Sequence, residues 1–126
     1  MSENTRAVAP LTTQIALDLI AYDRAPKYHG RSMVTLPIVC ADGWSVSVQA
    51  SWGHYCEDSN GERPAFDDTP VAHPYVSFEL GYPDGGDLSL LAEQDTGDSV
   101  YGYVPRATVE ALLDLHGGAV AWRDPA

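Results

Sequence analysis

The sequence predicts an α+β fold: an antiparallel sheet of about four strands, built on a hairpin, with one or two helices packed on one face. Three patterns support this fold class. Apolar and polar residues alternate on both sides of an Asp42-Gly43 turn signal, which is typical of two half-buried strands. A further alternating stretch covers residues 75–82, and residues 105–118 carry a helical apolar stripe that ends in a Gly-Gly pair.

The length of 126 residues suits one domain, which can bury roughly two thirds of the surface that the unfolded chain exposes. We expect residues 1–32 to form a tail and a helix, and residues 33–126 to form a single α+β domain. The first ten residues lack a basic stretch followed by an apolar run, so no signal peptide is predicted. No segment approaches the roughly 18 apolar residues of a membrane span. The expected location is therefore cytoplasmic.

Residues 11–22 fit two interpretations. Leu11, Ile15, Leu19 and Tyr22 recur at helical spacing, and a threonine at position 12 or 13 is available as N-cap. The same segment also alternates as a strand would. We favour the helix.

The hairpin occupies residues 33–52, and its loop length follows from parity. A two-residue loop would place the apolar residues of the two strands on opposite faces, because side chains alternate between faces along a strand. An odd loop, Asp42-Gly43-Trp44, pairs Cys40 with Val46 and brings both apolar sets to one face. We therefore predict the odd loop, with Trp44 exposed at its tip.

The rest of the chain follows in order. Residues 53–74 contain several glycines and prolines and are expected to form a long acidic loop, which is a frequent place for partner contacts. In the next strand, residues 75–82, Val76, Phe78, Leu80 and Tyr82 should share the buried face. Asp87 can cap a short helix over residues 87–94.

A strand over residues 100–104 and a helix close the sequence. Gly102 within this strand indicates a bulge or a close approach of two backbones. Pro105 suits the first turn of the helix, and Gly117-Gly118 suits its end. The stripe consists of Val109, Leu112, Leu113 and His116. Residues 119–122 fit a short edge strand.

Charge is strongly segregated along the chain. Of the 18 acids, eleven lie between Glu57 and Asp98 with a single base, Arg63, among them, so this stretch carries −10 of the total charge of −11. We expect one negative flank on the folded domain. Such a flank repels phosphates, which excludes direct nucleic-acid binding through it and favours a basic partner or a cation.

Candidate sites for chemistry are weak. His54 and Cys56 could bind a metal, but paired cysteines at zinc spacing are absent, and ordinary packing is the favoured interpretation. His116 at a helix C-terminus could act as a base, although a capping role fits better. Asp67-Asp68, with Glu57 and Asp58, could chelate a cation but lack the spacing of an EF-hand loop. No cofactor and no enzyme activity are predicted.

Neither cysteine is expected in a disulfide. Cys40 falls on the apolar face of the first strand, where a thiol behaves as a small hydrophobe. A cytoplasmic chain with two cysteines also argues against a bridge.

Four motifs resemble, in this order, a group of small acidic proteins encoded by tailed phages and prophages. They are Val46 to Ser51, His54-Tyr55-Cys56, Val100 to Pro105 and His116-Gly117-Gly118. The resemblance covers about residues 33–118, and this chain has Glu57-Asp58 where the group often has Pro-Arg. It implies a phage origin and supplies no catalytic residues.

The expected function is that of a phage-encoded inhibitor of a host defence complex, similar to an anti-CRISPR protein. It would bind a basic nucleic-acid-binding surface through the acidic flank, as a DNA mimic. The alternatives are a phage structural or assembly module without catalysis and a metal-assisted enzyme. The residues expected to contact the partner are Trp44, Glu57, Asp58, Glu62, Asp67, Asp68, Asp84, Asp87, Asp95 and Asp98.

Overall fold

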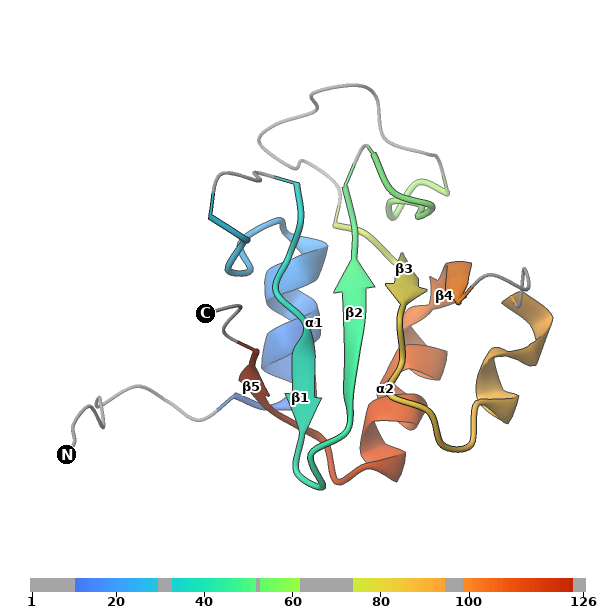
Figure 1. The fold of residues 1–126 in the computed structure, drawn as a ribbon. Coiled ribbons are helices and arrows are strands. Elements are labelled where there is room, and N and C mark those ends of the chain that lie inside the picture. Colours follow the sequence, from blue (N-terminus) through green and yellow to red (C-terminus); the bar gives the residue numbers. More distant parts are fainter. Residues whose placement is uncertain (1–10, 30–32, 52, 62–73, 95–98, 124–126) are drawn as a thin grey trace, which may run out of the picture.

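The structure, a computed structural model, describes residues 11–29, 33–51, 53–61, 74–94 and 99–123. The described elements are α1 (Thr13–Ala21), β1 (Ile38–Cys40), β2 (Ser45–Gln49), β3 (Ser77–Gly81), the 3₁₀ helix η1 (Ser89–Gln94), β4 (Val100–Pro105), α2 (Arg106–Leu115) and β5 (Ala119–Trp122). The strands form one antiparallel sheet in the order β4-β3-β2-β1-β5 (Figure 1). The predicted α+β class is confirmed, with five strands where about four were expected.

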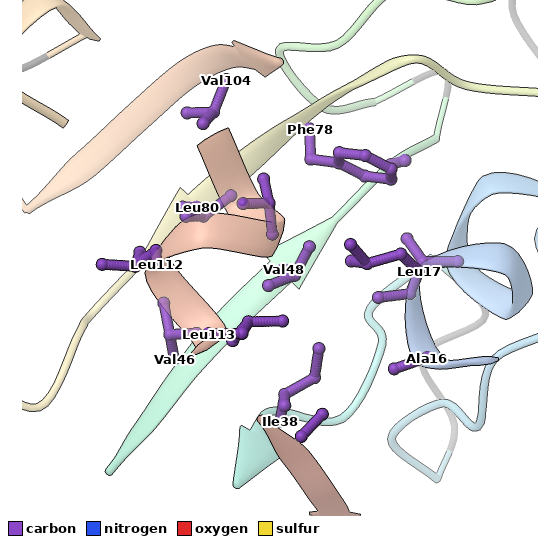
Figure 2. Close-up of a cluster of buried hydrophobic side chains, with 14 of the residues drawn as sticks. Ala16, Leu17, Ile38, Val46, Val48, Phe78, Leu80, Val104, Leu112 and Leu113 are labelled. Atoms are coloured by element: carbon purple, nitrogen blue, oxygen red, sulfur yellow. The ribbon is translucent and has the colours of Figure 1, made fainter. Parts of the chain in front are cut away.

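Helices α1 and α2 contact each other and pack on one face of the sheet (Figure 1). The core lies between the helices and this face. Figure 2 shows side chains from all these layers converging there, and the labelled ones are Ala16, Leu17, Ile38, Val46, Val48, Phe78, Leu80, Val104, Leu112 and Leu113. Each of them is at most 1% exposed, and burying one large apolar side chain contributes about 1.5–3 kcal/mol. No helix in the described part of the chain has the length and apolarity needed to cross a bilayer.

The helix predicted before the hairpin is confirmed, but only Leu11 and Leu19 of the four residues at helical spacing pack against the core. The Thr12 hydroxyl caps α1 by accepting a hydrogen bond from the Ile15 N–H at 3.1 Å. Ile15 and Tyr22 are exposed, whereas Leu17 and Ile20 are buried. Apolar residues cover most of the circumference of this short helix, so periodicity alone could not determine which side faces the core.

The β1–β2 loop is odd, as predicted, but it begins one residue earlier. It consists of Ala41-Asp42-Gly43, so Ile38, not Cys40, pairs with Val46. The predicted register is therefore wrong by two residues. A shift of two leaves the faces unchanged, and Ile38 and Val46 are both buried on the helix-covered face.

Strands β3 and β4 are joined through an irregular pairing. β3 is shorter than predicted, so Val76 and Tyr82 lie outside it and are exposed, contrary to expectation. The pairing of β3 with β4 shifts by one residue around Gly102, where Tyr103 adopts a positive φ of 56°. A Cβ atom at Gly102 would lie 3.0 Å from that of Tyr55, so this glycine has both of the predicted roles, a bulge and a close approach.

Helix α2 has the predicted end and three of the four residues of the predicted stripe, while His116 is its C-cap and only half-buried. Val109, Leu112 and Leu113 are fully buried. Gly117 and Gly118 both have positive φ, and the Gly118 N–H donates to the Leu113 carbonyl in the pattern of a Schellman motif. The short helix after β3 also forms, as η1, and Asp87 accepts a hydrogen bond from the Ser89 N–H at 3.0 Å.

Candidate functional site

Three segments that are far apart in sequence meet at one end of the sheet. The backbone N–H of Asp42, in the β1–β2 loop, donates to the His116 carbonyl at the end of α2 (3.1 Å). The backbone N–H of Asp84, in the β3–η1 connection, donates to the Ser45 carbonyl at the start of β2 (3.1 Å). Figure 1 shows these connections together at the lower end of the molecule.

Trp44 joins the three segments. Its ring stacks on the His116 ring, with centroids 4.1 Å apart and planes 2° from parallel. Its indole N–H donates to the Gly85 carbonyl at 2.8 Å. The side chain is 7% exposed, so the predicted exposure of Trp44 at the hairpin tip is wrong. The earlier start of the loop places Trp44 next to β2, on the core side with Val46.

Asp42 connects the loop to the end of α2. One carboxylate oxygen accepts the Trp44 backbone N–H (2.9 Å), and the other lies 2.7 Å from Nδ1 of His116. The hydrogen bond from Trp44 and the contact with His116 lower the pKa of Asp42. His116 therefore has the structural role that was favoured for it, at the end of the helix.

The end built in this way carries four carboxylates, and we call it the acidic end. Its members are Asp42, Asp84, Asp87 and Asp114, and all four are exposed. The hydrogen bonds from the backbone and hydroxyl of Ser89 lower the pKa of Asp87, so this carboxylate ionises readily.

The lysine and arginine side chains that the structure describes lie away from the acidic end. Arg106, at the start of α2, pairs with Asp18 (2.8 Å) and Glu110 (3.1 Å). Lys27 pairs with Asp23 at 2.9 Å. The other two, Arg24 and Arg123, follow α1 and β5. In the part of the chain that the structure describes, the acidic end thus has no lysine or arginine to balance it.

The nine predicted partner acids fall into four groups. Asp84 and Asp87 are exposed at the acidic end, and Glu57 is half-buried near the other end of the sheet. Asp58 is buried, contrary to the exposure that the predicted flank requires, because its carboxylate accepts the Asn60 N–H (2.9 Å) within a tight turn. The remaining five lie outside the described residues: Glu62, Asp67, Asp68, Asp95 and Asp98.

Asp42 and Asp114 were missed by the sequence reasoning. Both lie outside the acid-rich stretch, and only the folded chain brings them to the same end of the sheet as Asp84 and Asp87. A weak signal existed, since Asp42 belongs to the hairpin turn and Asp114 lies just before the glycine pair that ends the last helix.

The His54–Cys56 pair is embedded in hydrogen bonds. Nδ1 of His54 lies 2.6 Å from the Ser51 hydroxyl, and the Cys56 thiol donates to the Ser51 carbonyl (3.2 Å). Burial lowers the pKa of His54, which favours its neutral form. Among the described residues, no three His, Cys, Asp or Glu side chains are grouped in a way that could hold a metal ion.

Neither cysteine is suited to nucleophilic chemistry. Cys40 and Cys56 are both buried free thiols. Burial, reinforced by the charges of Asp42 and Asp114, raises the pKa of Cys40 to about 11. The thiolate is the reactive form, so Cys40 acts as a small apolar side chain of the core.

Comparison of the chain with protein-family models, with curated proteins and with solved structures gives no match.

Proposed function

We propose that this chain is a protein-binding inhibitor that binds a basic, nucleic-acid-binding surface of another protein through its acidic end. The observation that carries the proposal is the assembly of Asp42, Asp84, Asp87 and Asp114 from three segments around the Trp44–His116 stack. The stack and the hydrogen bonds around it hold the three backbone segments that carry these carboxylates in place. Because the segments are already ordered, binding a partner costs little conformational entropy.

The physical route is charge mimicry. A DNA strand presents one negative charge about every 3.4 Å, and proteins that bind it carry lysine and arginine channels. A folded surface of carboxylates is attracted to such a channel and competes with the nucleic acid for it. The total charge of −11 adds long-range attraction to the local contacts.

The specific form that we propose is a phage-encoded inhibitor of a host defence complex, of the anti-CRISPR kind. The support for it is the motif resemblance together with the charge. Nucleic acid itself is not the proposed ligand, because its phosphates are repelled by the acidic end.

The test compares two variants with the same change in net charge. Asp84→Asn/Asp114→Asn removes two charges at the acidic end, and Tyr22→Lys/Ala107→Lys adds two positive charges at exposed positions, at the C-terminal end of α1 and in the first turn of α2. Each variant is added to a DNA-binding host effector recovered by the wild-type chain, and DNA binding by the effector is measured. The wild type should inhibit at 50 mM salt and lose most of its effect at 500 mM. The first variant should inhibit much more weakly than the second.

Two results would contradict the proposal. Equal inhibition by the two variants would show that net charge matters and the acidic end does not. Inhibition that is insensitive to salt would exclude an electrostatic mechanism altogether.

A second candidate function, a non-catalytic assembly module, is favoured by exposed apolar side chains at Tyr82, Tyr103 and Val120. It requires self-association that persists at high salt, which sedimentation velocity at 50 and 500 mM salt measures. A monomer in both conditions contradicts assembly through copies of this chain.

A further inference from the structure

Two tyrosines stand together on the face of the sheet opposite the helices. Tyr55 and Tyr103 are 50% and 43% exposed, and their rings are 6.1 Å apart with a tilt of 40°. Tyr103 belongs to the bulge of β4, and Tyr55 belongs to the segment that follows β2. Exposed tyrosines in a pair are frequent contributors to binding energy at interfaces.

The backbone holds both rings in place. The Tyr103 N–H donates to the Tyr55 carbonyl at 3.0 Å, so the bulge is tied directly to the neighbouring segment. The absence of a side chain at Gly102 lets the Tyr55 Cβ approach β4, since a Cβ there would be 3.0 Å away. These contacts pre-organise the pair and reduce the entropy lost when a partner binds.

A carboxylate accompanies the tyrosines. The Tyr55 N–H donates to a carboxylate oxygen of Glu79 at 2.9 Å, and Glu79 is half-buried on the same face. The positive charge of Lys27 is felt at His54, which precedes Tyr55. The ammonium group of Lys27 is itself paired with Asp23. The surface therefore combines aromatic faces with negative charge.

We propose that Tyr55, Tyr103 and Glu79 form a docking surface for an arginine side chain of the basic partner. This tyrosine–glutamate surface deepens the proposed function, on which the choice of a basic partner rests. A guanidinium group stacks on an aromatic face and donates in its plane to carboxylates, whereas a lysine ammonium is more strongly hydrated and stacks less well. The aromatic pair thus selects arginine, and Glu79 supplies the charge complementarity.

The experiment uses two peptides of equal charge, one with two arginines and one with two lysines, titrated into the full chain and followed by the NMR signals of the tyrosine rings. The key variant is Tyr103→Asn, because asparagine tolerates a positive φ and the ring is removed without new backbone strain. Tyr82→Asn is the matched control, since Tyr82 is exposed and also has a positive φ, of 52°.

We expect the wild type and Tyr82→Asn to bind the arginine peptide about two- to fivefold more tightly than the lysine peptide. Tyr103→Asn should lose this preference, and Tyr103→Phe, which keeps the ring, should retain it. Equal binding of the two peptides by the wild type, or a preference that persists in Tyr103→Asn, would overturn the inference.

Failure of this inference can be distinguished from failure of the proposed function. The Asp84→Asn/Asp114→Asn variant keeps both tyrosines and reports on the acidic end. If it loses inhibition while Tyr103→Asn inhibits like the wild type, the proposed function stands and the arginine surface is excluded.

Discussion

The Trp44 side chain contacts both of the other segments that form the acidic end. Its contact with Gly85 spans 41 positions in the sequence, and its stacking partner His116 lies still further along. Alternation along the hairpin could predict the face of the strand but not these contacts. For this reason the sequence placed Trp44 at the exposed tip, whereas the structure buries it.

Replacement of Trp44 by phenylalanine tests this role. Trp44→Phe keeps an aromatic ring but removes the indole N–H that Gly85 accepts, so we expect a loss of about 1 kcal/mol in the free energy of unfolding. Urea denaturation measures it. Trp122→Phe, at a half-buried position of β5, is the control and should cost less. Equal costs would contradict a special role for Trp44.

Asp42 gives the acidic end a defined pH dependence. The pKa of Asp42 is lowered in the folded chain from its ordinary value of 3.8 by the hydrogen bond from Trp44 and by His116. A lowered pKa stabilises the folded state above the ordinary value, and this stabilisation is lost as the pH falls through the folded-state pKa.

Comparison of the wild type with Asp42→Asn isolates this effect. The wild type should gain stability relative to Asp42→Asn as the pH rises toward 3.8. Above that pH, the difference in unfolding free energy between the two proteins should stay constant until a group coupled to Asp42 titrates. Urea denaturation between pH 2 and pH 6 measures it. A difference that does not change below pH 4 would contradict the linkage.

Local signals were sufficient for most elements of this fold. Val109, Leu112 and Leu113 predicted the buried side of α2, and the parity of the hairpin loop predicted which face of the sheet is covered. The register was not predictable, because a shift of two residues preserves every face and only the actual turn decides it. The stripe of α1 was not predictable either, since this helix is apolar on several sides.

Sequence signals for the site were weaker than those for the fold. The acid-rich stretch indicated Asp84 and Asp87, which are exposed, but also Asp58, which is buried in its own turn. Asp42 and Asp114 reach the acidic end through the β1–β2 loop and the end of α2. Their proximity depends on tertiary packing, which a count of charges along the chain does not contain.

The glycine pair after α2 allows this packing, and its two members are not equivalent. A Cβ at Gly117 would lie 2.8 Å from the Ala41 Cβ in the β1–β2 loop, whereas one at Gly118 would be 3.5 Å from the Thr13 hydroxyl. Both have positive φ. Gly118→Ala should therefore cost roughly 1–2 kcal/mol from backbone strain. Gly117→Ala should cost more, because the helix end and the loop must also move apart.

Urea denaturation of the two variants tests this order, and each variant serves as the control for the other. The inhibition assay adds a functional readout: Gly117→Ala should weaken inhibition more than Gly118→Ala does, because it displaces the loop that carries Asp42. A larger cost for Gly118→Ala would show that the close approach to Ala41 does not restrain the acidic end.

At the scale of the whole molecule, the sheet has two irregular edge strands. The pairing of β5 with β1 shifts between Val39 and Cys40, and β4 carries the bulge at Gly102. Bulges at sheet edges disfavour pairing with further strands. The tyrosine–glutamate surface therefore fits side-chain contacts with a partner better than addition of a strand.

With a net charge of −11, we expect added salt to stabilise the folded chain. A protein stabilised mainly by ion pairs would instead lose stability. Described pairs of a carboxylate with lysine or arginine are few and lie near the surface, whereas the acidic end has like charges without a described lysine or arginine beside them. Because salt screens repulsion between exposed charges, we expect the free energy of unfolding to rise between 10 and 500 mM sodium chloride. Urea is the appropriate denaturant, since it carries no charge of its own.

The Asp84→Asn/Asp114→Asn variant separates the acidic end from the rest of the charge. If repulsion is concentrated there, this variant is more stable than the wild type at 10 mM salt, and its stability depends less on salt. Stability of the Tyr22→Lys/Ala107→Lys control should respond to salt nearly as the wild type does. Identical salt responses in the two variants would mean that repulsion is spread over the whole surface, and the acidic end would then lose the charge concentration on which mimicry depends.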